Sequence, residues 1–334
     1  MQRLTQLENW LATLYPNGSI GIETASADAS FRRYFRVTVA GEAHPLIAMD
    51  APPAHEDCGP WLQVAALFGA AGVHVPAVLA NDAEQGFILM SDLGSTTYLD
   101  ALTPDNAATL YGDALGSLVA IQRASRPGVL PAYTRDLLLR EMRLFPEWYI
   151  GRHIGLDLDD GQISALEAVF ERILEINLAE PSVFVHRDYH SRNLMRVADG
   201  TNPGIIDFQD AVYGPLSYDL VSLLKDAYIR WDEDFVLDQL IRYWEAARKL
   251  GLPVRSDFAD FHRDFEWMGV QRHLKVLGIF ARLSHRDGKD GYLKDLPLVM
   301  DYLRRTCTRY GALRPLLRLL ERIDPNPVQF GYTF

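Results

Sequence analysis

Two acidic residues, each placed after a short apolar run, are the part of the sequence best suited to catalysis. Asp188 follows the run at 183–185 (VFV), and Asp207 follows the run at 204–206 (GII). A carboxylate can orient a hydroxyl group and accept its proton, and carboxylate and amide oxygens are ligands that Mg²⁺ prefers. We therefore expect Asp188 to act as a general base, and Asn193 and Asp207 to hold Mg²⁺ from two loops, as phosphoryl transfer requires.

The spacing around Asp188 supports this interpretation. Residues 186–193 (HRDYHSRN) match H-R-D-x-x-x-x-N, the catalytic-loop pattern of kinases, and Asp207 follows at the expected distance. The alternative is a surface loop in which Asp188 caps a turn, because Asp and Asn are ordinary turn residues. The loop already has its base, so we interpret His186 as a structural hydrogen-bonding residue.

This segment is similar to the catalytic block of the aminoglycoside phosphotransferase and choline kinase superfamily. Residues 214–220 (GPLSYDL) resemble a further segment of that superfamily, with the proline one place early. The resemblance implies a protein-kinase-like fold, ATP and Mg²⁺ as cofactors, and a structural role for Asp219 in bonding the catalytic loop. The Ala-Pro-Glu signature of protein kinases is absent, and Phe208 is followed by Gln209 rather than glycine, which favours a small substrate.

Residues 87–94 (FILMSDLG) resemble the superfamily's hinge, where adenine bonds to backbone atoms. The resemblance implies that Met90 is the gatekeeper and that the Ser91 carbonyl and the Leu93 amide meet the adenine. The alternative is an ordinary strand that ends at Gly94.

Residues 26–31 (SADASF) lie where a kinase has its glycine-rich phosphate loop. The segment has no glycine, but its small residues, Ser30 among them, would let backbone amides approach phosphate. The lysine that normally contacts the α- and β-phosphates is missing, since the first lysine in the chain is Lys225. We expect an arginine to replace it, first Arg33 and second Arg32; alternatively, both are solvated strand ends.

The elements that must position these residues differ between the two parts of the chain. Alternating apolar residues predict strands at 33–39, 45–49, 74–79 and 86–90, with a helix at 61–68. Helical spacing then predicts helices at 137–149, 163–178, 219–228, 235–250 and 258–283, a closing pair within 300–323, and a helix capped by Thr103. We predict an α+β, protein-kinase-like two-lobed fold, with a small antiparallel sheet lobe (1–94) that binds nucleotide and a large helical lobe (95–334) that carries the catalytic loop and acceptor site.

Composition limits the partners. A net charge of −11 argues against wholesale binding to nucleic acid or an anionic membrane, and no apolar stretch is long enough for a membrane helix. The first residues lack the features of a signal peptide. Cys58 and Cys307 are far apart without metal-ligand spacing, so we interpret both as small buried hydrophobes in a reducing cytoplasm.

Over nearly its whole length the chain resembles the family of anomeric N-acetylmuramate/N-acetylglucosamine kinases of bacterial peptidoglycan recycling. The segments that carry the resemblance are 28–37, 49–53 (MDAPP), 56–58, 91–94, 96–99 and 272–283. That family also has a Met-Asp-Ala-Pro-Pro stretch in place of the lysine strand. The resemblance implies a reaction of ATP with a small amino sugar that gives the sugar α-1-phosphate and ADP, with a sugar-1-phosphate nucleotidyltransferase downstream as a pathway partner only.

Two rival functions stay open at this point. One is a different small-molecule kinase, acting on aminoglycosides or choline, whose cationic substrates would need an acidic acceptor pocket. The other is a non-catalytic pseudokinase that serves as a binding module. The missing lysine favours the pseudokinase, whereas Asp188, Asn193 and Asp207 oppose it.

The helix at 258–283 supplies the candidates for the acceptor site. Its apolar stripe comprises Trp267, Val270, Leu274, Leu277 and Ala281. Arg272, Lys275 and Arg282 fall together on a face turned away from that stripe. This face is either a solvated basic surface or, in part, the binding site for an anionic substrate group such as the lactyl carboxylate of N-acetylmuramate.

Overall fold

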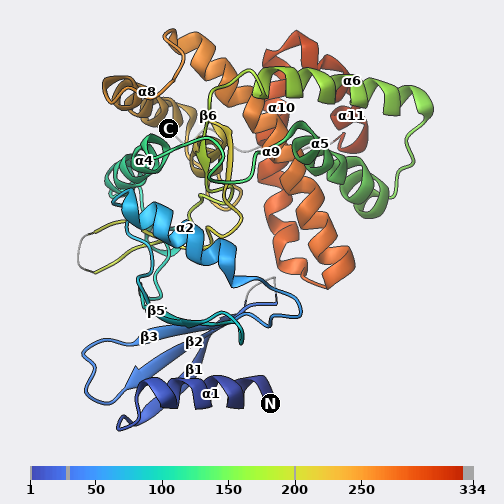
Figure 1. Ribbon diagram of the computed structural model, residues 1–334. Coiled ribbons are helices and arrows are strands. Elements are labelled where there is room, and N and C mark those ends of the chain that lie inside the picture. The colour runs from blue at the N-terminus through green and yellow to red at the C-terminus, as the bar shows by residue number, and fades with distance from the viewer. Residues whose placement is uncertain (1, 28–30, 199–200, 326–334) are drawn as a thin grey trace. The chain divides into compact units, whose positions relative to one another are not determined.

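The computed structural model describes residues 2–27, 31–198 and 201–325 (Figure 1). The chain divides into two compact units, Met1–Ala101 together with Asn193–Asp210, and Leu102–Arg192 together with Ala211–Phe334. The first unit therefore includes residues 193–210, which a boundary after residue 94 would assign to the second lobe. The last residue of the motif at 186–193 belongs to the first unit, and the other residues of that motif belong to the second.

The first unit is built on a five-stranded antiparallel sheet in the order β1-β2-β3-β5-β4. Its strands are β1 (Ile20–Ala27), β2 (Arg33–Val39), β3 (Leu46–Asp50), β4 (Val78–Asp82) and β5 (Phe87–Ser91). The helix α1 (Gln2–Leu14) lies along this sheet (Figure 1). Leu7, Trp10 and Leu11 fall on one face of α1 and pack with buried residues of β2 such as Val37, which closes the core of the sheet.

The first unit also contains the helices α2 (Cys58–Ala70) and α3 (Tyr98–Ala101) and a short hairpin, β7 (Leu194–Met195) with β8 (Gly204–Ile205). Asp57 caps α2 by accepting a hydrogen bond from the Gly59 amide at 2.8 Å. The hairpin joins the hinge segment through an apolar cluster of Leu93, Met195 and Val197.

The second unit is mainly helical. It comprises α4 (Ala107–Arg123), α5 (Arg135–Leu144), the π-helix η1 (Phe145–Ile154), α6 (Asp160–Asn177), α7 (Tyr218–Leu224), α8 (Glu233–Lys249), α9 (Phe258–Asp287), α10 (Leu296–Arg309) and α11 (Arg314–Ile323), with 3₁₀ turns at Asp290–Asp295 and Gly311–Leu313. The strands β6 (Ser182–Val185) and β9 (Val212–Pro215) pair antiparallel and flank the catalytic loop and the motif at 214–220. The 30-residue α9, orange in Figure 1, packs against α5, α6, α7, α10 and η1.

The predicted fold class is confirmed: a small antiparallel sheet is followed by a large helical part. The strand at 33–39 is confirmed with its predicted bounds, and Phe35, Val37 and Val39 are buried as a strand face should be. Cys58 and Cys307 are both free and buried. None of the helices in the described ranges is both long and apolar enough to cross a membrane.

Several predicted elements were wrong at their ends. The strand at 74–79 is instead Val78–Asp82, because Pro76 cannot donate to a sheet ladder and His74 forms only an isolated bridge to Gly204. Thr103 does not cap a helix. Its amide donates to the Asn106 side chain at 2.8 Å, and α4 begins after Asn106.

The helix predicted at 137–149 changes to a π-helix at Phe145, next to Pro146, and the helix predicted at 219–228 ends at Leu224. The sequence interpretation also missed α1 and β1, which precede the first strand that it assigned.

Gly278 allows α9 to approach the end of α5 closely. A Cβ atom at this position would lie 2.6 Å from the carbonyl oxygen of Leu144, so the backbone itself would have to move. We expect Gly278→Ala to lower the free energy of unfolding by about 1–3 kcal/mol, as overpacking does. Gly116→Ala is the matched control, because Gly116 also lies within a helix but has open space around it, and there alanine should stabilise by about 0.5–1 kcal/mol. Urea unfolding of both variants checks this, and changes of the same sign would contradict it.

Candidate active site

The first residues of the catalytic loop are held by the buried carboxylate of Asp219, at the start of α7. Its oxygens accept hydrogen bonds from two consecutive backbone amides, His186 at 2.7 Å and Arg187 at 3.0 Å. Arg187 has a φ of 78°, which an arginine adopts only when its surroundings hold it there. The loop-bonding role that resemblance implied for Asp219 is confirmed.

His186 supports the same loop from within. Its buried ring accepts a hydrogen bond from the Asp188 amide at 3.3 Å, so its predicted structural role is confirmed. Ser191 is anchored in a similar way, since its amide donates to the buried Asp226 carboxylate at 2.9 Å. The loop therefore presents Asp188 from a backbone that is fixed on both sides of it.

Cations surround the Asp188 carboxylate. Burial alone would raise the pKa of Asp188, but the positive charges of Lys275, Arg272 and Arg187 outweigh it and lower the pKa to about 2. His190 adds to this effect only at acid pH, because burial lowers its own pKa to about 4. Asp188 is thus ionised at neutral pH, as the predicted general base must be.

Two of the three cations predicted at the acceptor site, Arg272 and Lys275, are among the charges that act on Asp188. The side chains of Arg272 and Lys275 are almost fully buried, so the alternative of a solvated basic face is wrong for both. The reason is that α9 has neighbouring elements on all sides, so that residues opposite its apolar stripe are also covered. Arg272 donates to the Ser222 hydroxyl at 2.6 Å, whereas Arg282 is half-buried near the end of the helix.

Glu141 on α5 was not found from the sequence, although it organises the site. It forms ion pairs with Arg187 at 2.6 Å and with Lys275 at 3.1 Å, and it accepts a hydrogen bond from Tyr133. Lys275 also donates to the Tyr218 hydroxyl at 2.9 Å. The available signal was a glutamate among the buried positions of an amphipathic helix, where a lone carboxylate requires a charged partner.

The predicted metal ligands lie together in the first unit. The Asn193 amide donates to Asp207 Oδ2 at 3.2 Å, and Gln209 donates to Oδ1 at 2.8 Å. Asp207 has a φ of 63°, an unfavourable backbone conformation of the kind that occurs at functional sites. In the described part of the chain, no group of three or more His, Cys, Asp and Glu side chains could hold a metal ion. A cation here would need Asp207, Asn193 and phosphate oxygens together, which fits the way Mg²⁺ is usually bound.

The two candidate phosphate-binding arginines have different surroundings. Arg33 forms an ion pair with the fully buried Asp50, which Arg3 also contacts. Arg32 lies 4.0 Å from Asp207 Oδ1 and 3.8 Å from Glu56. This placement favours Arg32 as the phosphate contact, the reverse of the order expected from the sequence. Ser30 lies outside the described residues.

The hinge residues lie at the end of β5. Met90 is buried in the strand, and Ser91 pairs with Ala77 through its amide at 3.0 Å and its hydroxyl at 2.9 Å. Leu93 belongs to the buried apolar cluster with Met195 and Val197. The adenine contacts themselves stay a prediction.

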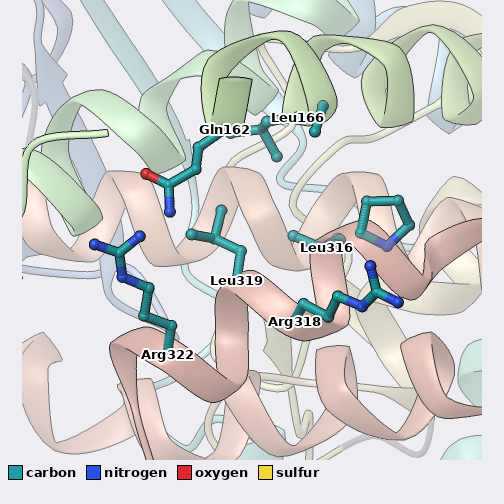
Figure 2. Close-up of a pocket in the computed structure, with 8 residues that line it drawn as sticks. Gln162, Leu166, Leu316, Arg318, Leu319 and Arg322 are labelled. Atoms are coloured by element: carbon teal, nitrogen blue, oxygen red, sulfur yellow. The ribbon is translucent and has the colours of Figure 1, made fainter. Parts of the chain in front are cut away.

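A pocket of about 250 Å³ lies elsewhere, between α6 and α11 (Figure 2). Figure 2 labels its lining residues Gln162, Leu166, Leu316, Arg318, Leu319 and Arg322. It contains none of the predicted site residues and no carboxylate that could act as a base. We therefore do not assign the reaction to it.

The fold is that of a kinase-like phosphotransferase. The catalytic loop is clamped at its start by Asp219, and a second aspartate, Asp207, follows the β7–β8 hairpin. The sequence pattern of the phosphotransferase enzyme family (APH) matches residues 21–255, and the chain belongs to this family.

Relatives over the full length are more specific. The chain is 49% identical to the N-acetylmuramate/N-acetylglucosamine kinase of Neisseria meningitidis serogroup B, covering 100% of each chain. It is 47% identical to the protein of the same name from Pseudomonas aeruginosa, covering 95% of this chain and 96% of the relative.

Solved structures show the same fold. The choline kinase LicA from Streptococcus pneumoniae has a TM-score of 0.63 at 12% identity, with 91% of this chain and 99% of the other covered. The ADP-bound aminoglycoside phosphotransferase APH(2'')-Ib has a TM-score of 0.56 at 14% identity, with 89% and 96% covered.

We expect Asp219→Ala to lower the free energy of unfolding by about 2–5 kcal/mol, because it leaves two buried backbone amides without an acceptor. Turnover should fall as well, since Arg187 loses the contact that holds its backbone. The control is Glu175→Ala, which breaks an exposed pair with Arg172 and should cost no more than about 1 kcal/mol. Denaturant unfolding measures the stability of both variants, and steady-state kinetics measure their turnover. If the Asp219→Ala protein were as stable as the control, Asp219 would not hold the catalytic loop as described.

Lys275→Met should move the acid limb of the pH profile of kcat/KM to higher pH. Lys275 is the strongest of the charges that lower the pKa of Asp188, so its removal raises that pKa, and the base becomes protonated at a higher pH. The expected displacement is about one pH unit or more. Unchanged profiles in the variant and the wild type would show that Lys275 does not act on the base.

Proposed function

We propose that this protein is an ATP-dependent sugar kinase that phosphorylates the anomeric hydroxyl of N-acetylmuramate, N-acetylglucosamine or both, in cell-wall recycling. The observation that carries the proposal is the ionised Asp188, fixed on a clamped loop and surrounded by cations. The full-length relatives at 49% and 47% identity, both named as kinases of these two sugars, support the choice of substrate.

The low pKa of Asp188 suits this acceptor. A carboxylate with a pKa near 2 is a weak base, and an anomeric hydroxyl is more acidic than an ordinary alcohol, so it needs less help to lose its proton. In the proposed step the C1 oxygen forms a bond to the γ-phosphorus while the bond from that phosphorus to ADP breaks. The hydroxyl proton passes to Asp188, and the products are the sugar α-1-phosphate and ADP.

The nucleotide side of the proposal uses residues of the first unit. Asp207 and Asn193 would hold Mg²⁺, which, when bound, neutralises charge on the phosphates. Arg32 would supply the positive charge in place of the missing lysine, because Arg33 already neutralises Asp50. Met90, Ser91 and Leu93 would form the adenine site.

The rival functions fit less well. Aminoglycosides and choline are cations, whereas Lys275, Arg272 and Arg187 make the surroundings of Asp188 positive. A cationic acceptor would be repelled from such a site. A pseudokinase would not need an ionised base on a strained, clamped loop in addition to Asn193 and Asp207.

The proposed reaction indicates the cell compartment and the next enzyme of the pathway. A kinase that consumes ATP is expected to work in the cytoplasm, where free thiols such as the buried Cys58 and Cys307 persist. A sugar 1-phosphate is the kind of product that a nucleotidyltransferase consumes, and we propose that type of enzyme as the next one in the pathway.

The test is sugar-dependent ADP release across a panel of N-acetylmuramate, N-acetylglucosamine, choline and an aminoglycoside. We expect activity with one or both N-acetyl sugars alone, and Asp188→Asn should reduce kcat by about 10²–10⁴-fold without loss of ATP binding. Asp207→Ala should instead abolish Mg²⁺-dependent ATP binding in calorimetry, because it removes the anionic ligand. Release of ADP with choline alone, or near-normal turnover in Asp188→Asn, would overturn the proposal.

A further inference from the structure

Arg192, the residue before Asn193 in the catalytic loop, differs from the other cations around Asp188. Its side chain is exposed, and its guanidinium lies over the ring of Tyr228 at 4.5 Å and near the ring of Tyr292 at 5.6 Å. An arginine that rests on aromatic faces keeps the N–H groups of its edge available for a planar acceptor. Arg192 is four residues from Asp188, so their Cα atoms are at most about 14 Å apart.

The charge of Arg192 has no close carboxylate partner within the described ranges, where no Asp or Glu oxygen lies within 4 Å of its guanidinium. The Tyr228 hydroxyl also accepts a hydrogen bond from Arg192, which leaves the other N–H groups of the guanidinium available. Arg192 is therefore a charged, exposed side chain on the catalytic loop, with N–H groups left over for an anion.

The surroundings of Arg192 are rigid. Asp226 accepts hydrogen bonds from the Ser191 amide at 2.9 Å and from the Tyr228 amide at 3.0 Å, so one buried carboxylate fixes both the loop and the ring on which Arg192 rests. Phe280 supports both rings, with centroid distances of 5.9 Å to Tyr228 and 5.1 Å to Tyr292. A cation held in this way loses little freedom when it binds an anion, which favours recognition.

Two of the three cations predicted at the acceptor site are bonded to protein groups. Lys275 pairs with Glu141, and Arg272 is buried and bonded to Ser222. Burial and the neighbouring Arg286 lower the pKa of Arg282, and Asp287 and Glu147 also act on it. Of the basic residues considered for the acceptor, Arg192 is the one that combines exposure, a position on the catalytic loop and no carboxylate partner within 4 Å among the described residues.

We propose that Arg192, resting on Tyr228 and Tyr292, binds the lactyl carboxylate of N-acetylmuramate and so determines the preference for the anionic over the neutral sugar. The inference rests on the proposed function, since it assumes that the sugar presents its C1 hydroxyl to Asp188. N-Acetylglucosamine lacks the lactyl group and would leave Arg192 in water.

The test compares kcat/KM for the two sugars in the wild type and in Arg192→Gln. The ratio of kcat/KM for N-acetylmuramate to that for N-acetylglucosamine should fall about ten- to a hundredfold in the variant, mainly through KM, as expected for loss of a charge-assisted bond. With the methyl ester of N-acetylmuramate as substrate in place of the acid, kcat/KM of the wild type should be lower by a similar factor. In the variant the same replacement should have a far smaller effect. Arg192→Lys should restore part of the ratio.

Arg248→Gln is the matched control, because Arg248 is also an exposed arginine over an aromatic ring, that of Trp244 at 4.6 Å, on α8. In this variant the ratio of kcat/KM for N-acetylmuramate to that for N-acetylglucosamine should equal the wild-type ratio. If Arg192→Gln leaves the ratio unchanged, or if the methyl ester is used as well as the acid, the assignment of Arg192 is overturned while the kinase activity stands. If the wild type phosphorylates neither sugar, the proposed function itself fails.

Discussion

The structure around the candidate base depends on the bond between the Asp219 carboxylate and two consecutive amides of the catalytic loop. Each buried amide would otherwise lack an acceptor, and Arg187 would have no reason to keep its positive φ. Because the Arg187 backbone turns in this way, its side chain reaches Glu141, and the residue that follows it is Asp188. A single carboxylate in α7 thus sets both the direction of the base and the first ion pair of the cluster behind it.

That cluster gives the site its electrostatic character. Glu141 neutralises part of the charge of Arg187 and Lys275, which makes it possible to bury them, and the remaining positive potential acts on Asp188. A buried ion pair costs much of its Coulombic gain in desolvation, so we do not regard the cluster as a source of stability. Its consequence is chemical, because it keeps the base ionised and the acceptor side positive. Both properties agree with an acidic hydroxyl on an anionic or neutral sugar.

Sequence spacing predicted the residues that carry the chemistry, since Asp188, Asn193 and Asp207 belong to one short pattern with apolar runs before each part. The sequence interpretation did not identify Glu141. It could not predict the burial of Lys275, because helical periodicity identifies one apolar face and says nothing of a helix covered on every side. Sequence spacing also could not predict the ion-pair partners of Arg33 and Arg32. Only the pairing of β2 with β3 brings Asp50 opposite Arg33, and Arg32 is left near Asp207.

The central claim is that the anomeric oxygen of an N-acetyl sugar attacks the γ-phosphorus of ATP with Asp188 as base. The most direct measurement is ³¹P NMR of the product made from N-acetylmuramate or N-acetylglucosamine labelled with ¹⁸O at C1. The account predicts a sugar α-1-phosphate whose phosphorus signal shows the isotope shift of a bridging ¹⁸O, because the C1–O bond is kept and a new O–P bond forms. A phosphate ester at another hydroxyl, without the isotope shift, would contradict it.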